Sequence, residues 1–124
     1  MCHQRVNARF RLRKSAEVQR VRQAGKVYAH PLLLLIVLKN DLQQPRFAVS
    51  ASRAIGKAVQ RNRAKRRIRA ALQTMMASIE PGWDLLVLAR PPATKATFQE
   101  TRSALLALLK RANLVKEKHG NSIR

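Results

Sequence analysis

The amino-acid sequence predicts an α+β fold, a two-layer α-β sandwich in which three helices pack on a central, mostly antiparallel sheet of about four strands. Three observations predict it. The chain has 124 residues, 46% of them hydrophobic, which suits a single domain (1–124) with a sizeable core. Short apolar runs and segments of helical periodicity follow one another in the order α-β-β-(β)-α-β-α. Gly and Pro separate these segments. We expect the core to span about residues 10–115, with a polar tail (116–124) that frays and a basic arm (1–14) that either frays or becomes ordered on RNA.

The first predicted element is a short helix over residues 15–24. Ser15 is a good N-cap, Glu17 lies in the positive first turn, and Gly25 can end the helix. A short extra strand is expected at residues 27–29.

Two strands follow. Residues 32–39 form an almost continuous apolar run, which indicates a strand buried on both faces. Turn residues come next, including Asp41 and Pro45, and residues 46–52 alternate between apolar and small polar side chains. This pattern predicts a hairpin in which residues 46–52 form the second strand.

Residues 57–78 contain neither Gly nor Pro and predict a long helix. Its faces differ, because Arg63 and Arg66 lie opposite an apolar stripe at helical spacing. The stripe consists of Ala64, Ile68, Leu72, Met75 and Ile79. The helix is therefore expected to pack with one face and to present cations with the other.

The C-terminal part predicts one more strand and one more helix. Residues 83–90 are again almost wholly apolar. Thr97 and Glu100 form a T-x-x-E capping box, which starts a helix over about residues 98–115. We expect Phe98 to belong to the buried face of this helix.

The charge balance points to a polyanionic partner. Lys and Arg number 26 against 6 acids, so the net charge is +20, and such self-repulsion costs stability unless a polyanion offsets it. The six acids are scattered along the chain, which disfavours a two-metal nuclease or a glycosidase. Cys2 is the single cysteine, which excludes an internal disulfide and a cysteine zinc cluster.

The sequence also argues against a membrane protein. The basic N-terminus lacks an apolar signal core, and the longest apolar run is too short to span a bilayer. We therefore expect a cytoplasmic protein.

The most informative feature is a basic run. Eight of the seventeen residues from 53 to 69 are Arg or Lys, and residues 42–79 contain no acid. Like charges at helical spacing repel each other, and a row of phosphates would supply the missing anions. Arg binds phosphate with two parallel hydrogen bonds, Asn62 can bind a base edge or a 2′-OH, and the helix start after Gly56 offers backbone N–H groups. The run predicts nucleic-acid binding.

Residues 55–69 read I-G-K-A-V-Q-R-N-R-A-K-R-R-I-R. This stretch closely resembles the motif I-G-x-A-V-x-R-N-R-x-K-R-x-I-R of the protein subunit of bacterial ribonuclease P. Residues 11–14 (R-L-R-K) and the segment 84–93 are also similar to that family, so the resemblance covers roughly residues 10–115.

The resemblance implies a four-stranded sandwich with a left-handed β-α-β crossover. It also implies that catalysis belongs to an RNA subunit and its Mg²⁺ ions, with no catalytic residue and no metal in the protein. The implied partners are that catalytic RNA and precursor tRNA, whose 5′ leader runs between the first helix and the sheet. No membrane and no obligate protein partner are implied.

The implied sites fall into two groups. The RNA-binding residues are Arg11, Arg13, Lys14, Arg53, Lys57, Arg61, Asn62, Arg63, Lys65, Arg66, Arg67 and Arg69. The leader-cleft residues are Val18, Arg22, Tyr28, Ile36, Phe47 and Arg90, of which Tyr28 and Phe47 are the candidates for base stacking.

The predicted cleft departs from the family pattern. Val18, Arg22 and Ile36 stand where family members often have aromatics, and Ala54 stands where a basic residue is common. Each lost stacking platform weakens base binding by about 1–3 kcal/mol. We therefore expect leader binding to depend on charge, through Arg22, Arg53 and Arg90.

Three other readings are compatible with the charge. A structural RNA-binding protein, such as a ribosomal protein, would bind RNA without promoting tRNA 5′ cleavage. A membrane-surface protein would bind anionic lipid through the basic helix, although this helix lacks aromatic anchors. A protein-only nuclease would cleave RNA without an RNA subunit, which the scattered carboxylates disfavour.

Overall fold

The computed structural model describes residues 15–40 and 45–115. Within them the chain forms three α-helices, four strands and three short 3-10 helices, which confirms the predicted order, the extra short strand included. The elements are α1 (Ser15–Ala24), β1 (Lys26–Ala29), β2 (Leu33–Lys39), β3 (Arg46–Ala51), η2 (Arg53–Ile55), α2 (Ala58–Gln73), η3 (Met76–Ser78), β4 (Trp83–Ala89), η4 (Pro91–Lys95) and α3 (Phe98–Arg111).

The four strands form one mixed sheet in the order β1-β2-β4-β3. β1 pairs with β2, and β2 with β4, in antiparallel fashion, whereas β3 and β4 are parallel. The predicted hairpin of β2 and β3 is therefore wrong, because β4 lies between them. β4 is buried over almost its whole length and gains most from a central position, whereas β3 is largely half-buried and takes an edge.

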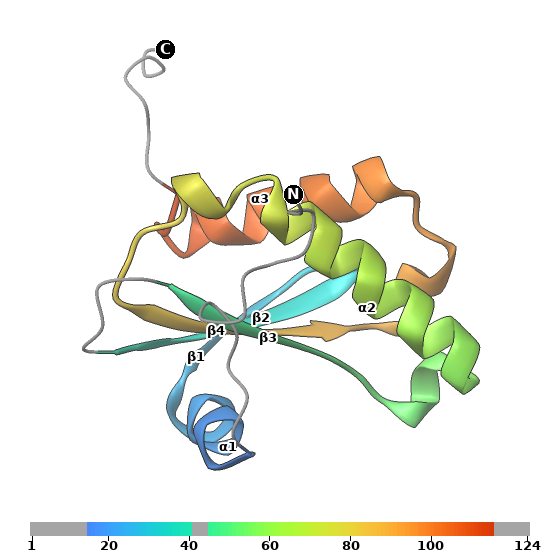
Figure 1. Cartoon of the computed structure of the whole chain (residues 1–124), viewed down its shortest axis with the longest axis horizontal. Helices are drawn as coiled ribbons and strands as arrows, with labels where there is room; N and C mark the ends of the chain where they lie inside the picture. The colour runs from blue at the N-terminus through green and yellow to red at the C-terminus, as the bar shows by residue number, and fades with distance from the viewer. Residues whose placement is uncertain (1–14, 41–44, 116–124) are drawn as a thin grey trace, which may run out of the picture.

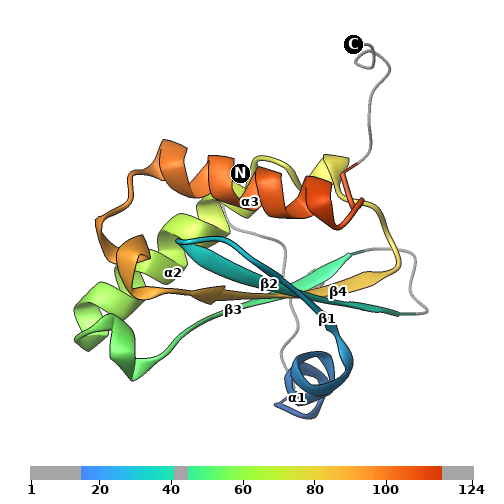
Figure 2. The same ribbon diagram turned by 180° about the vertical axis from the view of Figure 1, so that it is seen from behind.

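The helices cover both faces of the sheet (Figures 1 and 2). α2 and α3 lie on one face, and α1 lies alone on the other. Because side chains of a strand alternate between faces, each face has its own core. In the described part of the chain, no helix is long and apolar enough to cross a membrane.

The larger core lies under α2 and α3, and the smaller one lies under α1. The larger core includes Leu33, Leu35, Phe47, Leu85, Val87, Ile68, Leu72, Leu105 and Leu108. The smaller one is built on Val21, Ile36 and Leu86, with Val18, Leu38, Ala48 and Leu88 packed against it.

α2 has the two predicted faces but is shorter than predicted. Its apolar stripe is buried, including Met75 and Ile79 beyond its end. The helix ends at Gln73, and residues Met76–Ser78 form a separate 3-10 turn. Thr74 follows the helix and directs its hydroxyl to Ala71 O at 2.7 Å. No Gly or Pro marks this end, so the sequence carried no stop signal for it.

α3 begins with the predicted capping box. Thr97 Oγ1 accepts the Glu100 N–H at 3.0 Å, and Glu100 Oε1 accepts the Thr97 N–H at 2.9 Å. The helix ends at Arg111 rather than at residue 115. Phe98 is 38% exposed, so its predicted place in the core is wrong, and the buried face of α3 starts at Thr101.

Candidate nucleic-acid interface

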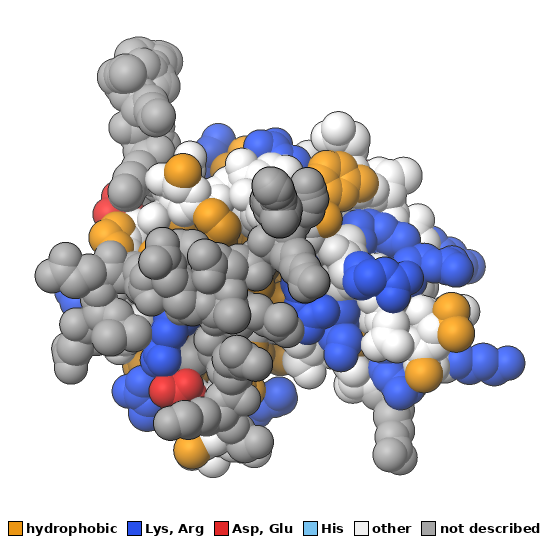
Figure 3. Space-filling view, viewed as in Figure 1, with side chains coloured by type: hydrophobic (Ala, Val, Ile, Leu, Met, Phe, Trp, Pro, Cys, Tyr) orange, Lys and Arg blue, Asp and Glu red, His pale blue; other side chains and the backbone are white. Residues whose placement is uncertain are grey.

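α2 presents the basic run on its exposed side. Asn62, Arg63 and Arg66 are exposed, and Lys57 is exposed just before the helix. Arg61, Lys65, Arg67 and Arg69 are half-buried and flank this row. In the space-filling view, Lys and Arg side chains gather over α2 (Figure 3). We call Lys57, Arg61, Asn62, Arg63, Lys65, Arg66, Arg67 and Arg69 the cationic face of α2.

Part of this face is held in place and part is free. Arg61 Nη1 donates to Gly56 O at 2.9 Å, and Arg67 Nη1 donates to Ala93 O at 3.1 Å. Arg63, Lys65 and Arg66 make no hydrogen bond or ion pair with any other described residue. Their cations therefore remain available to an external anion, as the basic run predicts.

Gly56 shapes the start of α2. Its φ is +141°, which L side chains rarely adopt, and a Cβ on it would collide with Gln60 Oε1. That oxygen accepts the Lys57 N–H at 3.0 Å. One of the backbone donors expected to be free at this helix start is thus already used inside the protein.

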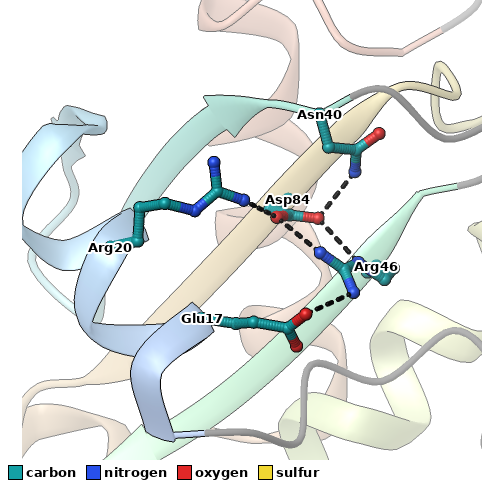
Figure 4. A network of polar contacts seen from close by, with 5 residues as sticks. All are labelled: Glu17, Arg20, Asn40, Arg46 and Asp84. Carbon is teal, nitrogen blue, oxygen red and sulfur yellow. Dashed lines mark hydrogen bonds and ion pairs between the residues drawn. The ribbon is translucent and has the colours of Figure 1, made fainter.

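On the other face of the sheet, an ionic network ties α1 to β3 and β4 (Figure 4). Asp84 is fully buried. Its carboxylate accepts from Arg46 Nε and Nη2, both at 3.0 Å, from Asn40 Nδ2 at 2.6 Å and from Arg20 Nη2 at 3.4 Å. Arg46 Nη1 also donates to Glu17 Oε2 at 3.1 Å. This network bridges the first helix and the sheet.

The network stabilises its charges mutually. Hydrogen bonding to Asp84 raises the pKa of Arg46 above its ordinary value, Glu17 adds to this rise, and partial burial opposes it. Sequence reasoning missed the network, because its members are far apart in the chain. The available signal was Asp84 itself, since an acid inside an apolar strand needs buried partners.

Three predicted leader-cleft residues lie at or near α1. Val18 is half-buried and packs on the small core, and Ile36 of that core is 4% exposed. Arg22 is exposed in the last turn of α1. Arg90 is exposed after the end of β4, and its Nη1 donates to His30 O at 3.3 Å.

The two predicted stacking residues do not lie on this face. Phe47 is 1% exposed and belongs to the large core under α2 and α3. Tyr28 is half-buried and packs against the same core, with Lys26 Nζ 5.6 Å and Arg111 Cζ 6.0 Å from its ring centre. Strand alternation puts both aromatic rings opposite α1, so their assignment to the leader cleft is wrong.

The remaining predicted residues are only partly covered. Arg11, Arg13 and Lys14 lie outside the described residues, and only the backbone of Arg53 is described, as the first residue of η2. Among residues 15–40 and 45–115, no three His, Cys, Asp or Glu side chains form a group that could hold a metal ion.

The fold and these surfaces define a class of protein, a small basic α-β sandwich with a cationic helix face of the kind typical of nucleic-acid-binding proteins. The sequence model of the family Ribonuclease P matches residues 6–113. The chain therefore belongs to the ribonuclease P protein family.

Relatives and solved structures agree with this membership. The ribonuclease P protein component of Herpetosiphon aurantiacus is 35% identical over 84% of this chain and 85% of its own length. The ribonuclease P protein component of Listeria innocua is 33% identical over 94% of this chain and 99% of its own length. The Staphylococcus aureus RNase P protein has a TM-score of 0.77 at 29% identity and covers 86% of this chain and 98% of that one. The Thermotoga maritima RNase P protein, solved in complex with 1-(4-fluorophenyl)-2-thiourea, has a TM-score of 0.74 at 29% identity. The match covers 81% of this chain and 97% of that one.

Proposed function

We propose that this ribonuclease P protein binds the catalytic RNA of the holoenzyme through the cationic face of α2. The observation that carries the proposal is that cations on this face, Arg63, Lys65 and Arg66 among them, pair with no other described residue, in a helix that contains no acid. Phosphates would neutralise them and release counterions. The buried stripe of the same helix fixes their direction, because Ala64, Ile68 and neighbouring apolar residues hold it against the core.

The substrate side of the proposal is the 5′ leader of precursor tRNA, bound along the sheet face beside α1. Leu34, Ala48, Ser50 and Leu88 are half-buried and point to this face by strand alternation. None of them is aromatic, so base stacking is weak there and exposed cations have to supply the affinity.

Catalysis is proposed to rest with the RNA subunit and Mg²⁺ bound by that RNA. The described residues bring together no cluster of carboxylates for a metal ion. The protein would act by offsetting the repulsion between two folded RNAs, which is strongest when Mg²⁺ is scarce.

The test is precursor-tRNA cleavage at low Mg²⁺ with a bacterial ribonuclease P RNA, with and without this protein, and with protein alone. The proposal expects cleavage at the mature 5′ end only when both are present. Binding of the RNA without any gain in cleavage would instead indicate a structural RNA-binding protein. Cleavage by the protein alone would contradict the assignment of catalysis to the RNA.

The charge dependence of leader binding has its own test. The triple variant Arg22→Gln, Arg53→Gln, Arg90→Gln should weaken holoenzyme affinity for leader-bearing substrate and lower its salt slope by up to about 2, since each lost contact to single-stranded RNA contributes about 0.7. Leaderless tRNA is the matched control and should bind as before. Unchanged affinity for the leader-bearing substrate would contradict this mode of binding.

A further inference from the structure

A shallow cavity of about 460 Å³, largely open to solvent, lies between the β1–β2 turn, η4 and the first turns of α3. Its size lies within the range of about 300–1,000 Å³ that is typical of ligand pockets. Leu32, Pro92 and Ala96 provide an apolar wall, while His30, Gln99 and Ser103 provide polar groups. It lies on the opposite side of the sheet from α1, because α3 packs on the face that α1 does not cover.

Several polar side chains of this cavity have no partner within the described residues. Lys95, Gln99 and Ser103 make no hydrogen bond or ion pair there. His30 Nδ1 accepts the Leu32 N–H at 3.0 Å, which leaves Nε2 to bind an external group. Glu100 uses Oε1 in the capping box and keeps its other oxygen as an acceptor. The cavity thus offers donors and acceptors to an external group.

One cation lines the cavity, and two more lie at the turn beside it. Arg90 Nη1 donates to His30 O at 3.3 Å, and Arg111 Nη1 donates to Ala29 O at 2.8 Å, so both guanidinium groups are held at the turn that forms one side of the cavity. Lys95 lines the cavity from η4. Three cations against the single carboxylate of Glu100 favour a ligand that carries negative charge outside the cavity.

The cavity lies next to the cationic face of α2, with η4 between them. η4, which forms one wall, packs against both α2 and η2. Ala93 O of η4 also accepts the hydrogen bond from Arg67. A nucleic-acid strand that contacts α2 can therefore reach the cavity along the surface of the protein.

We propose that this cavity binds a single unpaired nucleotide of RNA, with the base inside and its phosphates against Lys95 and Arg111. The imidazole of His30 and the apolar wall suit a flat ring, and the amide of Gln99 can both donate to and accept from a base edge. This proposal rests on the proposed function, since it assumes an RNA partner. The nucleotide can come from the catalytic RNA or from precursor tRNA, which share this chemistry.

The test fills the cavity. Ser103→Phe places a ring in it from an exposed position on α3, and Ala107→Phe places the same ring one turn further along α3, outside the cavity. Lys95→Glu is a second variant, at an exposed position, and it reverses a charge rather than adding bulk. Affinities are measured for the full-length protein with ribonuclease P RNA, and for the holoenzyme with precursor tRNA, and thermal unfolding checks that each variant is folded.

We expect Ser103→Phe to weaken binding by about five- to hundredfold, the equivalent of one lost stacked base. Lys95→Glu should also weaken binding, because it replaces a phosphate contact by a repulsion, and Ala107→Phe should leave binding unchanged. A loss in the first assay assigns the nucleotide to the catalytic RNA, and a loss only in the second assigns it to the substrate. The proposal is overturned if Ser103→Phe is folded and both it and Lys95→Glu bind as the unmodified protein does. It is also overturned if Ala107→Phe loses as much affinity as Ser103→Phe. Failure of the unmodified protein to bind either RNA would contradict the proposed function itself.

Discussion

Asp84 illustrates how a single residue can organise this fold. Its carboxylate is fully buried in β4 and is satisfied by Arg46, Asn40 and Arg20, which come from β3, the end of β2 and α1. A buried carboxylate without such partners would be strongly destabilising. Asp84 therefore holds three elements in register and fixes α1 over the sheet.

We predict that Asp84→Asn destabilises the protein by about 3–5 kcal/mol, because it leaves the largely buried Arg46 charge without its main partner. Urea unfolding measures this loss. Glu17→Gln is the matched control, since Glu17 is 31% exposed at its side chain and pairs with the same arginine, and it should cost less than about 1 kcal/mol. Equal effects of the two substitutions would contradict a dominant role for the buried carboxylate.

Gly56 sets the entry into α2. We predict that Gly56→Ala destabilises the protein by about 1–3 kcal/mol, because its φ of +141° is strained for alanine and the added Cβ meets the Gln60 side chain. Thermal unfolding and RNA affinity measure the effect. Gln60→Ala removes the side chain that the new Cβ meets. Gly56→Ala should therefore cost less stability when it is made in the Gln60→Ala variant than when it is made in the unmodified protein. An equal cost in both would mean that backbone strain accounts for the whole effect.

Among individual residues, the sequence predicted those whose signal is local. The basic run and the Thr97–Glu100 capping box are visible within a few positions, and the structure confirms both the cationic helix face and the capping box. The Asp84 network and the burial of Phe47 depend on which segments meet in space. Alternation alone places Phe47 on one face of a strand, but it does not tell which face receives the two helices.

At the scale of elements, one face of α2 packs in the core and the opposite face carries exposed cations. Its apolar stripe packs in the larger core, while Arg63, Lys65 and Arg66 make no hydrogen bond or ion pair with any other residue of 15–40 and 45–115. The same helix can therefore lose these cations and keep its place.

We predict that Arg63→Gln, Lys65→Gln, Arg66→Gln together weaken binding to ribonuclease P RNA and lower its salt slope by about 2–3, since each lost phosphate contact contributes about 0.7–0.9. Thermal stability should stay the same or rise. Lys110→Gln, which removes an exposed cation from α3, is the control and should leave the slope nearly unchanged. A drop with Lys110→Gln about one third as large as that of the triple variant, in proportion to the charges removed, would mean that net charge alone governs binding.

The order of the strands was the main error at this scale. Turn residues between β2 and β3 suggested a hairpin, yet β4 pairs with both strands. Turn signals are local, whereas the centre of a sheet goes to the strand that can be buried on both faces. The near-continuous apolar run of β4 carried that information. Burial of β4 on both faces determines the strand order more strongly than the short connection between β2 and β3.

At the scale of the whole molecule, charge and fold oppose each other. The protein carries +20 on 124 residues, and the described ion pairs involve only two of its six acids, Glu17 and Asp84. Most cations therefore repel one another in the free protein. The apolar cores under the two sheet faces hold the fold together against this repulsion, which an RNA partner would relieve.

We predict that the melting temperature of the free protein rises between 0.1 M and 1 M NaCl, because the Debye length falls from about 10 Å to about 3 Å and screens this repulsion. The pair of Arg46 and Asp84 is too buried to be screened to the same extent. The variant Arg63→Gln, Lys65→Gln, Arg66→Gln lowers the net charge from +20 to +17, as 20 minus 3. Self-repulsion grows with about the square of the net charge. The salt-induced rise in melting temperature should therefore be roughly three quarters as large for this variant as for the unmodified protein. A melting temperature that falls or stays constant with salt would show that self-repulsion does not limit the stability of the free protein.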